Sequence, residues 1–341
     1  MGIAGRTGKD YQKPPETDWF YSGGLLGLFI HFGISTVSAE GDLSWAMIDG
    51  KPWGDTHTIT PRQYWEQAKS FNPAGFDPEN WLKAAKDAGF SYAVFTSRHH
   101  DGFSNWPSDY GYLNTKNYMG GRDLVGEYMS ACRKTGIAAG LYYSPPDWFV
   151  ERYHRSFMYG SGTKEFPGRP HKGMNHEVLA ELTPVPKNLK EDYAVYVSGQ
   201  VRELLTRYKP DILWFDGSFQ YDGETYITAE EVFSLQPNVI INDRNTYMGG
   251  GYGSANFEGP MPETRGDFFE CCDIWTEGCG WGWTKYCTGF RSARWLYDRY
   301  CTARGLGGNF LINAGPMADG TLSPVYYQRL RELKEILRAE K

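Results

Sequence analysis

Two short segments of the sequence place chemically active side chains next to apolar runs. Asp216 follows an apolar Leu-Trp-Phe run and precedes a glycine. A carboxylate in such a position either caps the next helix or takes part in chemistry. In the segment Thr96–Phe103, His99 and His100 are adjacent and are followed by Asp101. Neighbouring imidazoles are costly to bury without polar partners, so we expect them to hydrogen-bond ligand hydroxyls or to bind a metal ion together with carboxylates.

Similar polar groups recur at the ends of other apolar runs. They are His31, the Tyr142-Tyr143-Ser144 run, and the Asn242-Asp243-Arg244 run. In parallel barrels the carboxyl ends of the strands meet on one face, where active sites are built. Side chains far apart in sequence are therefore predicted to converge, which favours an enzyme.

The elements that must position these groups follow a βα alternation. Short runs rich in β-branched and aromatic residues predict strands at Gly27–Phe32, Tyr92–Ser97, Ala138–Ser144, Ile212–Asp216, Val239–Asn242, Phe268–Trp275 and Asn309–Asn313, with an eighth strand weaker than these. Helical patterns lie between them, at Pro61–Ser70, Pro78–Ala88, Arg122–Thr135, Leu189–Tyr208, Ala229–Leu235, Ala293–Arg304 and Pro324–Glu340. The alternation predicts an α/β fold, a (β/α)8-like TIM barrel.

The chain of 341 residues fits one such domain, 1–341, with a long Pro- and Gly-rich loop insertion at about 145–188 that is expected to cover part of the site's mouth. The last predicted helix ends near the last residue, so no C-terminal β-sandwich is expected.

The composition and charge of the chain indicate which kinds of binding partner to expect. The 35 Lys and Arg against 41 Asp and Glu give a net charge of −6, and no basic stripe is present, so we expect no nucleic-acid partner. No apolar run approaches the roughly 18 residues of a membrane span, so no membrane partner is expected. Aromatic residues make up 16% of the chain, which suits stacking on sugar rings and ordinary core packing equally. The sequence leaves a homo-oligomer open.

The six cysteines include no Cys-X-X-Cys pair, so neither a disulfide scaffold nor a zinc knuckle is predicted. Residues 1–18 are polar and lack the apolar core of a signal peptide. A cytoplasmic protein and a trimmed secreted or periplasmic form both fit.

Taken together, six blocks in order resemble the α-L-fucosidases of glycoside hydrolase family 29. They are Gly27–Gly33, Arg98–Phe103 with Trp106–Ser108, Gly140–Ser144, Trp214–Gly217, Asn242–Arg244, and Gly307–Pro316 with Asp319-Gly320. The resemblance implies a retaining exo-hydrolase that removes terminal α-L-fucose from an oligosaccharide or glycoconjugate by double displacement, without a metal or another cofactor.

By position, the resemblance implies that Asp216 is the nucleophile. It also implies that His31, His99, His100, Tyr142 and Arg244 contact the sugar or the nucleophile, and that Trp45 lies at the mouth. Retaining hydrolysis requires such a carboxylate and a second carboxyl group as acid/base. Arg244 can also pair with Asp216 and keep it ionised.

Two departures from the family pattern stand out. Many members carry Glu-Trp after the first strand, whereas this chain has Ser44-Trp45, so that carboxylate contact is either absent or supplied by Glu40 or Asp42.

The acid/base motif aligns ambiguously, and three glutamates compete for the role. Glu258 is preferred because it follows Asn256-Phe257, with Glu263 second and Glu270 third. Glu270 lies inside a predicted strand and is expected to make a structural hydrogen bond.

Two other classes of protein stay open at this point. The first is a barrel that binds fucosylated glycans without cleaving them, suggested by Ser44 and the displaced acid motif. The second is a metal-dependent hydrolase built on His31, His99, His100 and Asp216. A fucoside assay separates the first from an enzyme, and a chelator tests the second.

Overall fold

The computed structural model describes residues 13–52, 57–217, 227–244 and 255–340. In this part of the chain, eight strands form one sheet, and every neighbouring pair is parallel. The strands are β1 (Leu26–Ile30), β2 (Tyr92–Arg98), β3 (Ala138–Tyr143), β6 (Ile212–Phe215), β7 (Ile240–Ile241), β8 (Ala255–Glu258), β9 (Phe269–Ile274) and β12 (Asn309–Asn313). All seven predicted strands are present, and β8 is the weak eighth.

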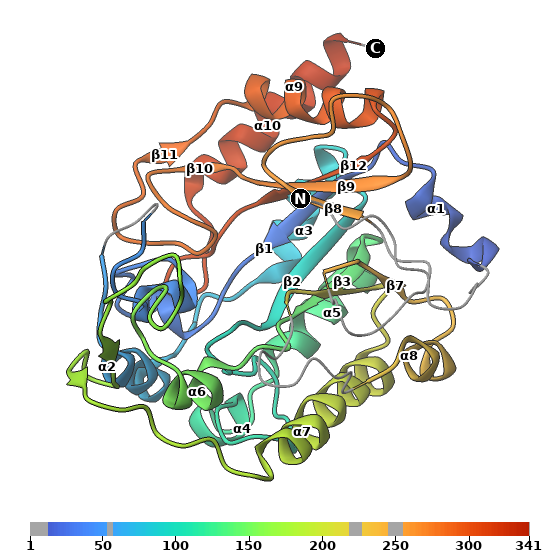
Figure 1. Cartoon of the computed structure of the whole chain (residues 1–341). Helices are drawn as coiled ribbons and strands as arrows, with labels where there is room; N and C mark the ends of the chain where they lie inside the picture. Colours follow the sequence, from blue (N-terminus) through green and yellow to red (C-terminus); the bar gives the residue numbers. More distant parts are fainter. Residues whose placement is uncertain (1–12, 53–56, 218–226, 245–254, 341) are drawn as a thin grey trace.

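The sheet curls in the strand order of a barrel. Its hydrogen-bonded order is β7-β6-β3-β2-β1-β12-β9-β8, so β7 and β8 lie at the two ends (Figure 1). A side-chain hydrogen bond joins these ends, because Asn242 Nδ2, just after β7, donates to Asn256 Oδ1 of β8 at 2.7 Å. The predicted (β/α)8-like fold is therefore confirmed, with side chains spanning the seam.

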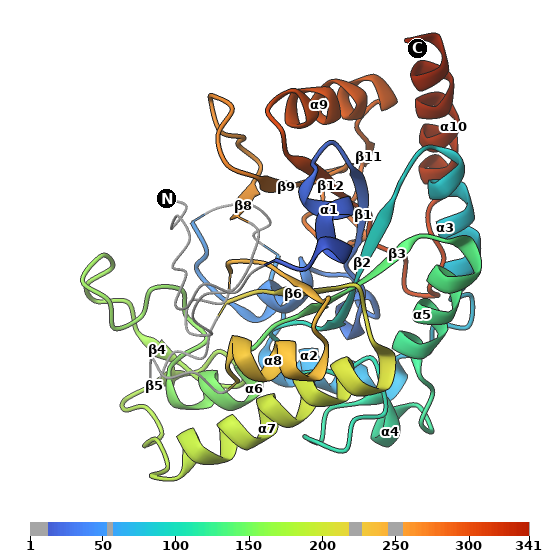
Figure 2. The same cartoon turned by 90° about the vertical axis from the view of Figure 1, so that its right-hand side faces the viewer.

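Helices cover the outer surface of the sheet (Figures 1 and 2). The longer ones are α2 (Pro61–Glu66), α3 (Pro78–Asp87), α5 (Leu124–Thr135), α7 (Leu189–Glu203), α8 (Ala229–Leu235), α9 (Ala293–Gly305) and α10 (Pro324–Ala339). Each agrees with a predicted helix. Polar caps begin several of them: the Thr60 side chain caps α2 in a capping box, and Asp77 and Asp123 cap α3 and α5. Short helices α1 (Asp18–Tyr21), α4 (Thr115–Tyr118) and α6 (Trp148–Glu151) were not predicted.

The strands are buried on both faces, as expected for parallel strands between a barrel interior and a helical layer. Phe29, Tyr92, Tyr142 and Trp214 pack together in one cluster of buried side chains. Gly27 of β1 is required there, because a Cβ atom at this position would lie 2.3 Å from the Tyr92 ring. This aromatic cluster forms the floor on which the polar strand ends rest.

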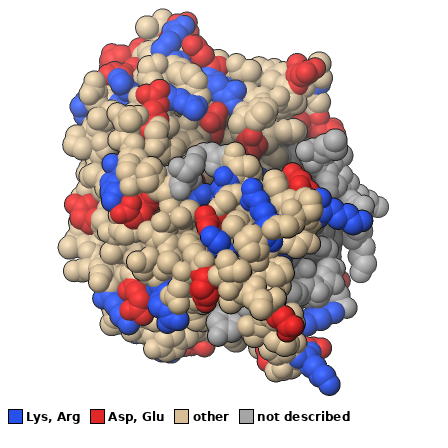
Figure 3. Space-filling view, turned by 60° about the vertical axis from the view of Figure 1, so that its left-hand side comes forward, with Lys and Arg blue, Asp and Glu red and all other residues tan. Residues whose placement is uncertain are grey.

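Among the described residues, two antiparallel strand pairs lie outside the barrel. The insertion at 145–188 contains α6 and the pair β4 (His171–Lys172) and β5 (Val178–Leu179). The second hairpin is β10 (Thr276–Glu277) with β11 (Gly289–Phe290). No helix in the described ranges is long and apolar enough to cross a membrane. On the face in Figure 3, acidic and basic side chains are interspersed.

Candidate active site

A cavity of about 400 Å³ lies at the carboxyl ends of the barrel strands. Eight of the nine predicted site residues line it: His31, Trp45, His99, His100, Tyr142, Asp216, Arg244 and Glu258. Their elements explain the convergence, because β1, β2, β3, β6, β7 and β8 are parallel neighbours or meet across the seam. The strand topology thus gathers side chains that are more than 200 residues apart in sequence.

Asp216 lies at the centre of this cavity and is held from both sides. Its Oδ1 atom accepts hydrogen bonds from Arg244 Nη2 at 2.8 Å and Nε at 3.1 Å, and its Oδ2 atom accepts one from the Tyr142 hydroxyl at 2.7 Å. Burial raises the pKa of Asp216, but the Arg244 guanidinium, His100 and the Tyr142 hydroxyl outweigh it and hold the pKa well below its usual value. The carboxylate is therefore ionised, as the predicted pairing with Arg244 requires.

The three histidines lie around Asp216, and each has one ring nitrogen occupied by a neutral partner. His31 Nδ1 pairs with Asn313 Oδ1 at 2.7 Å, and His100 Nδ1 pairs with Ser144 Oγ at 2.5 Å. Burial lowers the pKa of both His31 and His100 to about 4, although the Asp216 charge opposes the shift. Burial likewise holds the pKa of His99 well below its usual value. At neutral pH these imidazoles are uncharged and suit hydrogen bonding to hydroxyl groups.

Arg244 connects the two carboxylates of the cavity. While Nη2 holds Asp216, Nη1 donates to Glu258 Oε2 at 3.4 Å, so one guanidinium bridges both acids. Glu258 is the last residue of β8, and its side chain is 47% exposed. This places one buried and one solvent-accessible carboxyl group in the same cavity.

The other two candidate acids lie elsewhere. Glu263 is exposed, in the connection between β8 and β9, and does not line the cavity. Glu270 is fully buried on β9 and accepts hydrogen bonds from Tyr92 and Trp214. Of the three glutamates, only Glu258 lines the cavity.

Ser44 stands where many family members carry glutamate. Its hydroxyl pairs with His99 Nδ1 at 2.5 Å, and it is fully buried. Of the two alternatives for the missing carboxylate contact, the structure favours its absence: Glu40 pairs with Lys285, and Asp42 Oδ1 accepts from the Gly282 amide at 2.8 Å. Neither carboxylate lines the cavity.

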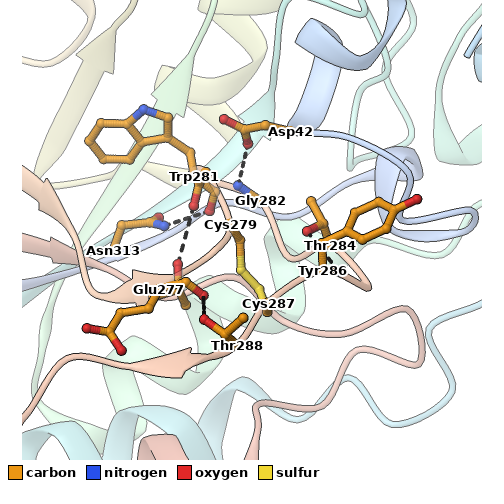
Figure 4. The surroundings of a disulfide bond; sticks show 12 residues. Asp42, Glu277, Cys279, Trp281, Gly282, Thr284, Tyr286, Cys287, Thr288 and Asn313 are labelled. Carbon is orange, nitrogen blue, oxygen red and sulfur yellow. Dashed lines mark hydrogen bonds between the residues drawn. A yellow bond between two sulfur atoms is a disulfide. The ribbon is translucent and has the colours of Figure 1, made fainter. Parts of the chain in front are cut away.

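One wall of the cavity is held by a disulfide bond that the cysteine pattern did not predict. Cys279 and Cys287, eight residues apart, close the loop between β10 and β11. Figure 4 shows Trp281 on this loop, with its carbonyl oxygen accepting a 2.6 Å hydrogen bond from Asn313 Nδ2. The Trp281 ring lies 5.3 Å from that of His31. A local pairing of this kind has no spacing motif that would reveal it in one sequence.

Other lining residues were missed because they do not follow a predicted strand end. Trp148 and Arg152 come from the start of the 145–188 insertion, which supports the expectation that this segment covers part of the mouth. The Arg152 guanidinium lies 5.0 Å above the Trp148 ring, and Trp45 packs edge-on against Trp148 at 4.9 Å. Cys272 of β9 also lines the cavity.

One group of side chains has the ligand types of a metal site. Among the described residues, His99, His100 and Asp216 have ligand atoms that lie within 4.8 Å of one another. The Arg244 guanidinium already neutralises Asp216 through its Oδ1 atom at 2.8 Å, and the Tyr142 hydroxyl donates to its Oδ2 atom, so a divalent cation there would face a positive charge close by. This donor set therefore fits a metal ion poorly.

A parallel barrel whose strand ends surround an ionised carboxylate, a second carboxyl group and neutral hydrogen-bonding side chains has the site of a glycoside hydrolase. The family model described as Alpha-L-fucosidase matches residues 6–340. The chain therefore belongs to the α-L-fucosidase family, and the resemblance found in the sequence is confirmed.

Individual relatives agree with this assignment. The chain is 28% identical to the human tissue α-L-fucosidase over an alignment 345 positions long, which covers 93% of this chain and 66% of that protein. The mouse protein is 29% identical, with 93% and 68% covered. The chain thus spans about two thirds of the length of these relatives.

Solved structures show the same fold. α-L-Fucosidase isoenzyme 1 from Paenibacillus thiaminolyticus superposes with a TM-score of 0.71 at 28% identity, covering 95% of this chain and 75% of that one. The Thermotoga maritima α-fucosidase in complex with fucose gives a TM-score of 0.69 at 25% identity, covering 96% and 74%.

Proposed function

We propose that this protein is a retaining exo-α-L-fucosidase that removes terminal α-L-fucose from fucosylated oligosaccharides or glycoconjugates. The observation that carries the proposal is the Arg244 guanidinium, which bridges Asp216 and Glu258 in one cavity. The identity of the sugar, α-L-fucose, is inferred from membership of the α-L-fucosidase family.

The sugar is bound by neutral donors and acceptors. His31, His99 and His100 line the cavity together with the aromatic side chains of Phe29 and Trp214. Uncharged imidazoles bind hydroxyl groups without competing for the charge of Asp216. The aromatic floor closes the cavity beneath the ring, which favours a terminal sugar over one inside a chain.

In the first step, an Asp216 carboxylate oxygen attacks the anomeric carbon, and the bond from that carbon to the leaving oxygen breaks. Glu258, protonated at this stage, gives its proton to the leaving oxygen, so that the aglycone departs as an alcohol. The low pKa of Asp216 keeps the nucleophile ionised throughout the working pH range. The product of this step is a fucosyl ester on Asp216.

In the second step, Glu258 is ionised and takes a proton from water, whose oxygen attacks the anomeric carbon. The ester bond breaks, Asp216 regains its charge, and Glu258 is protonated again. The exposure of Glu258 supports both roles, because the leaving group and the water approach from the open side. Two inversions give net retention at the anomeric carbon.

Proton NMR of the hydrolysis of an aryl α-L-fucoside tests the proposal. We expect α-L-fucose to appear first and to mutarotate later. Initial release of the β-anomer would show inversion, and calorimetric binding without release would favour a glycan-binding barrel.

The nucleophile is tested separately by Asp216→Gly and Asp216→Asn. Each variant should lose roughly 10⁴-fold or more in kcat, because neither can form the ester. Circular dichroism should show an intact fold. Turnover close to that of the wild type in either variant would remove Asp216 from this role.

A further inference from the structure

Glu270 is a buried carboxylate for which the proposed reaction has no direct use. It lies on β9 with no exposed surface. Its Oε1 atom accepts hydrogen bonds from Trp214 Nε1 at 2.7 Å and Asn256 Nδ2 at 3.2 Å, and its Oε2 atom accepts one from the Tyr92 hydroxyl at 2.7 Å. All three donors are neutral. Burying a carboxylate among neutral donors is costly compared with an apolar side chain of similar size, so stability alone does not explain it.

One of the two shortest of these contacts, at 2.7 Å, holds the indole ring of Trp214. An indole has a single N–H donor, so a hydrogen bond to Glu270 selects one orientation of the ring. Two residues of the site lie against that ring. The Tyr142 ring is stacked on it at 5.6 Å with an interplanar angle of 18°, and the Arg244 guanidinium carbon lies 5.2 Å from its centroid.

Tyr142 and Arg244 are the side chains that hold Asp216. The Tyr142 hydroxyl contacts one carboxylate oxygen, and Arg244 contacts the other. A Trp214 ring that turned would therefore move both partners of the carboxylate at once. Glu270 is therefore connected to Asp216 indirectly, through the Trp214 ring, which contacts both Tyr142 and Arg244.

A second arm of the same network runs to β8. Asn256, which donates to Glu270 Oε1, lies two residues before Glu258 and thus on the same face of the strand. Its own Oδ1 accepts the hydrogen bond from Asn242 across the seam. Glu270 therefore links the strand that carries Asp216 to the strand that carries Glu258.

We propose that Glu270 is a positioning residue for the reaction: through Trp214 it fixes Tyr142 and Arg244 against Asp216, and through Asn256 it fixes the strand that ends at Glu258. This inference rests on the role proposed for Asp216. The sugar-binding histidines are held by other groups, since His31 pairs with Asn313 and His99 with Ser44. Loss of Glu270 should therefore lower kcat much more than it raises KM.

The test compares three variants on an aryl α-L-fucoside. Glu270→Leu removes every acceptor, and its kcat should fall by about 100-fold while KM changes by less than about threefold. Glu270→Gln keeps one acceptor oxygen for Trp214 and should lose only about three- to tenfold. Tyr92→Phe removes the hydrogen bond on the far oxygen, leaves the Trp214 contact intact, and should stay within about threefold of the wild type.

The rate of trapping by a 2-deoxy-2-fluoro-fucosyl fluoride, which reports the attack of Asp216 alone, should fall in parallel with kcat. A folded Glu270→Leu variant with kcat within threefold of the wild type would overturn the inference. So would a Tyr92→Phe variant that loses as much kcat as Glu270→Leu.

A double-mutant cycle keeps the test decisive if Glu270→Leu does not fold. Trp214→Phe retains an aromatic platform but lacks the indole N–H. Glu270→Gln should then cost little further kcat in the Trp214→Phe background, because the contact it weakens is already gone. An equal loss in both backgrounds would overturn the inference. The two failures are distinguishable: a wild type that releases no fucose contradicts the proposed function, whereas an active wild type with equal losses in both backgrounds contradicts only the role of Glu270.

Discussion

At the scale of single residues, the cavity combines neutral histidines with an arginine that lies between its two carboxylates. Burial lowers the pKa of His31 and His100 to about 4, so both imidazoles are uncharged at neutral pH. The guanidinium of Arg244 balances the charge of Asp216 and reaches Glu258 as well. Each carboxylate can therefore change its bonding during a reaction while the positive charge between them stays in place, which is how a preorganised site lowers a barrier.

The acid/base role of Glu258 predicts two kinetic effects in the Glu258→Ala variant: a loss of kcat that depends on the leaving group, and rescue by azide. Glu258→Ala should lose about 10²- to 10⁴-fold in kcat on fucosylated sugars, which need a proton on the leaving oxygen, but far less on nitrophenyl fucoside. Added azide should restore turnover and give a fucosyl azide, because this anion attacks the intermediate without a base. Both substrates and the azide product are followed by chromatography.

Glu263→Ala is the matched control, since it removes a carboxyl group five residues further along the chain that does not line the cavity. It should behave like the wild type. Azide rescue in Glu263→Ala, with a normal Glu258→Ala, would exchange the two assignments.

The Arg244 contact also predicts the response to metal ions. A divalent cation on His99, His100 and Asp216 would face the guanidinium 2.8 Å from the same carboxylate. We therefore expect hydrolysis to be unaffected by excess EDTA and not to be activated by added zinc. Loss of activity in EDTA that zinc restores would contradict this expectation.

At the scale of elements, apolar runs predicted the strands that are buried on both faces, such as Asn309–Asn313, whose bounds agree in full. The strand Ala255–Glu258 was indistinct because Asn256 and Glu258 on it serve the network and the cavity instead of the core. The resemblance to a family predicted eight of the residues that line the cavity. Trp148 and Arg152 were not predicted as site residues, because their positions depend on how an irregular segment folds, and the local sequence pattern does not determine that.

The loop between β10 and β11 has an element-scale role that can be tested. It carries Trp281, whose carbonyl accepts from Asn313, and Asn313 Oδ1 in turn pairs with His31 Nδ1 at 2.7 Å. The Cys279–Cys287 bond closes this short loop, which in the chain-entropy model is worth about 2–3 kcal/mol. The double variant Cys279→Ser, Cys287→Ser should therefore raise KM several-fold, with a smaller change in kcat.

A dithiol reductant should reproduce this increase in the wild type and add nothing in the double variant. Cys301→Ser, at a free cysteine on α9, is the control and should keep the response of the wild type. A double variant with unchanged KM would show that hydrogen bonds alone hold the loop.

At the scale of the whole molecule, buried ionisable groups couple folding to pH in opposite directions. The folded-state pKa of His31 and His100 is about 4, below the ordinary 6.5, so the unfolded state binds more protons and stability falls as pH drops from 6.5 to 4. Glu151, buried on α6, acts in reverse. Burial raises its pKa to about 8 from 4.5, while Arg155 and Arg152 pull it down in part.

Glu151 therefore predicts how stability changes above pH 6.5. There the histidines are neutral in both states, whereas the folded state keeps a proton on Glu151 that the unfolded state has lost. Stability should fall as pH rises towards 8, with a slope of at most roughly 1.4 kcal/mol per pH unit, and should level off above that pH. Thermal unfolding followed by calorimetry between pH 6 and 9 measures this slope.

Glu151→Gln replaces the carboxyl group by a neutral one of the same shape, so the slope between pH 6.5 and 8 should disappear and the variant should gain on the wild type as pH rises. Glu191→Gln removes the same formal charge at an exposed position on α7 and should follow the wild type. If Glu151→Gln keeps the slope, another buried group binds the proton. Only below about pH 4.5, where Glu151 carries a proton in both the folded and the unfolded state, should the two Gln variants show the same acid dependence, because the histidines are unchanged in both.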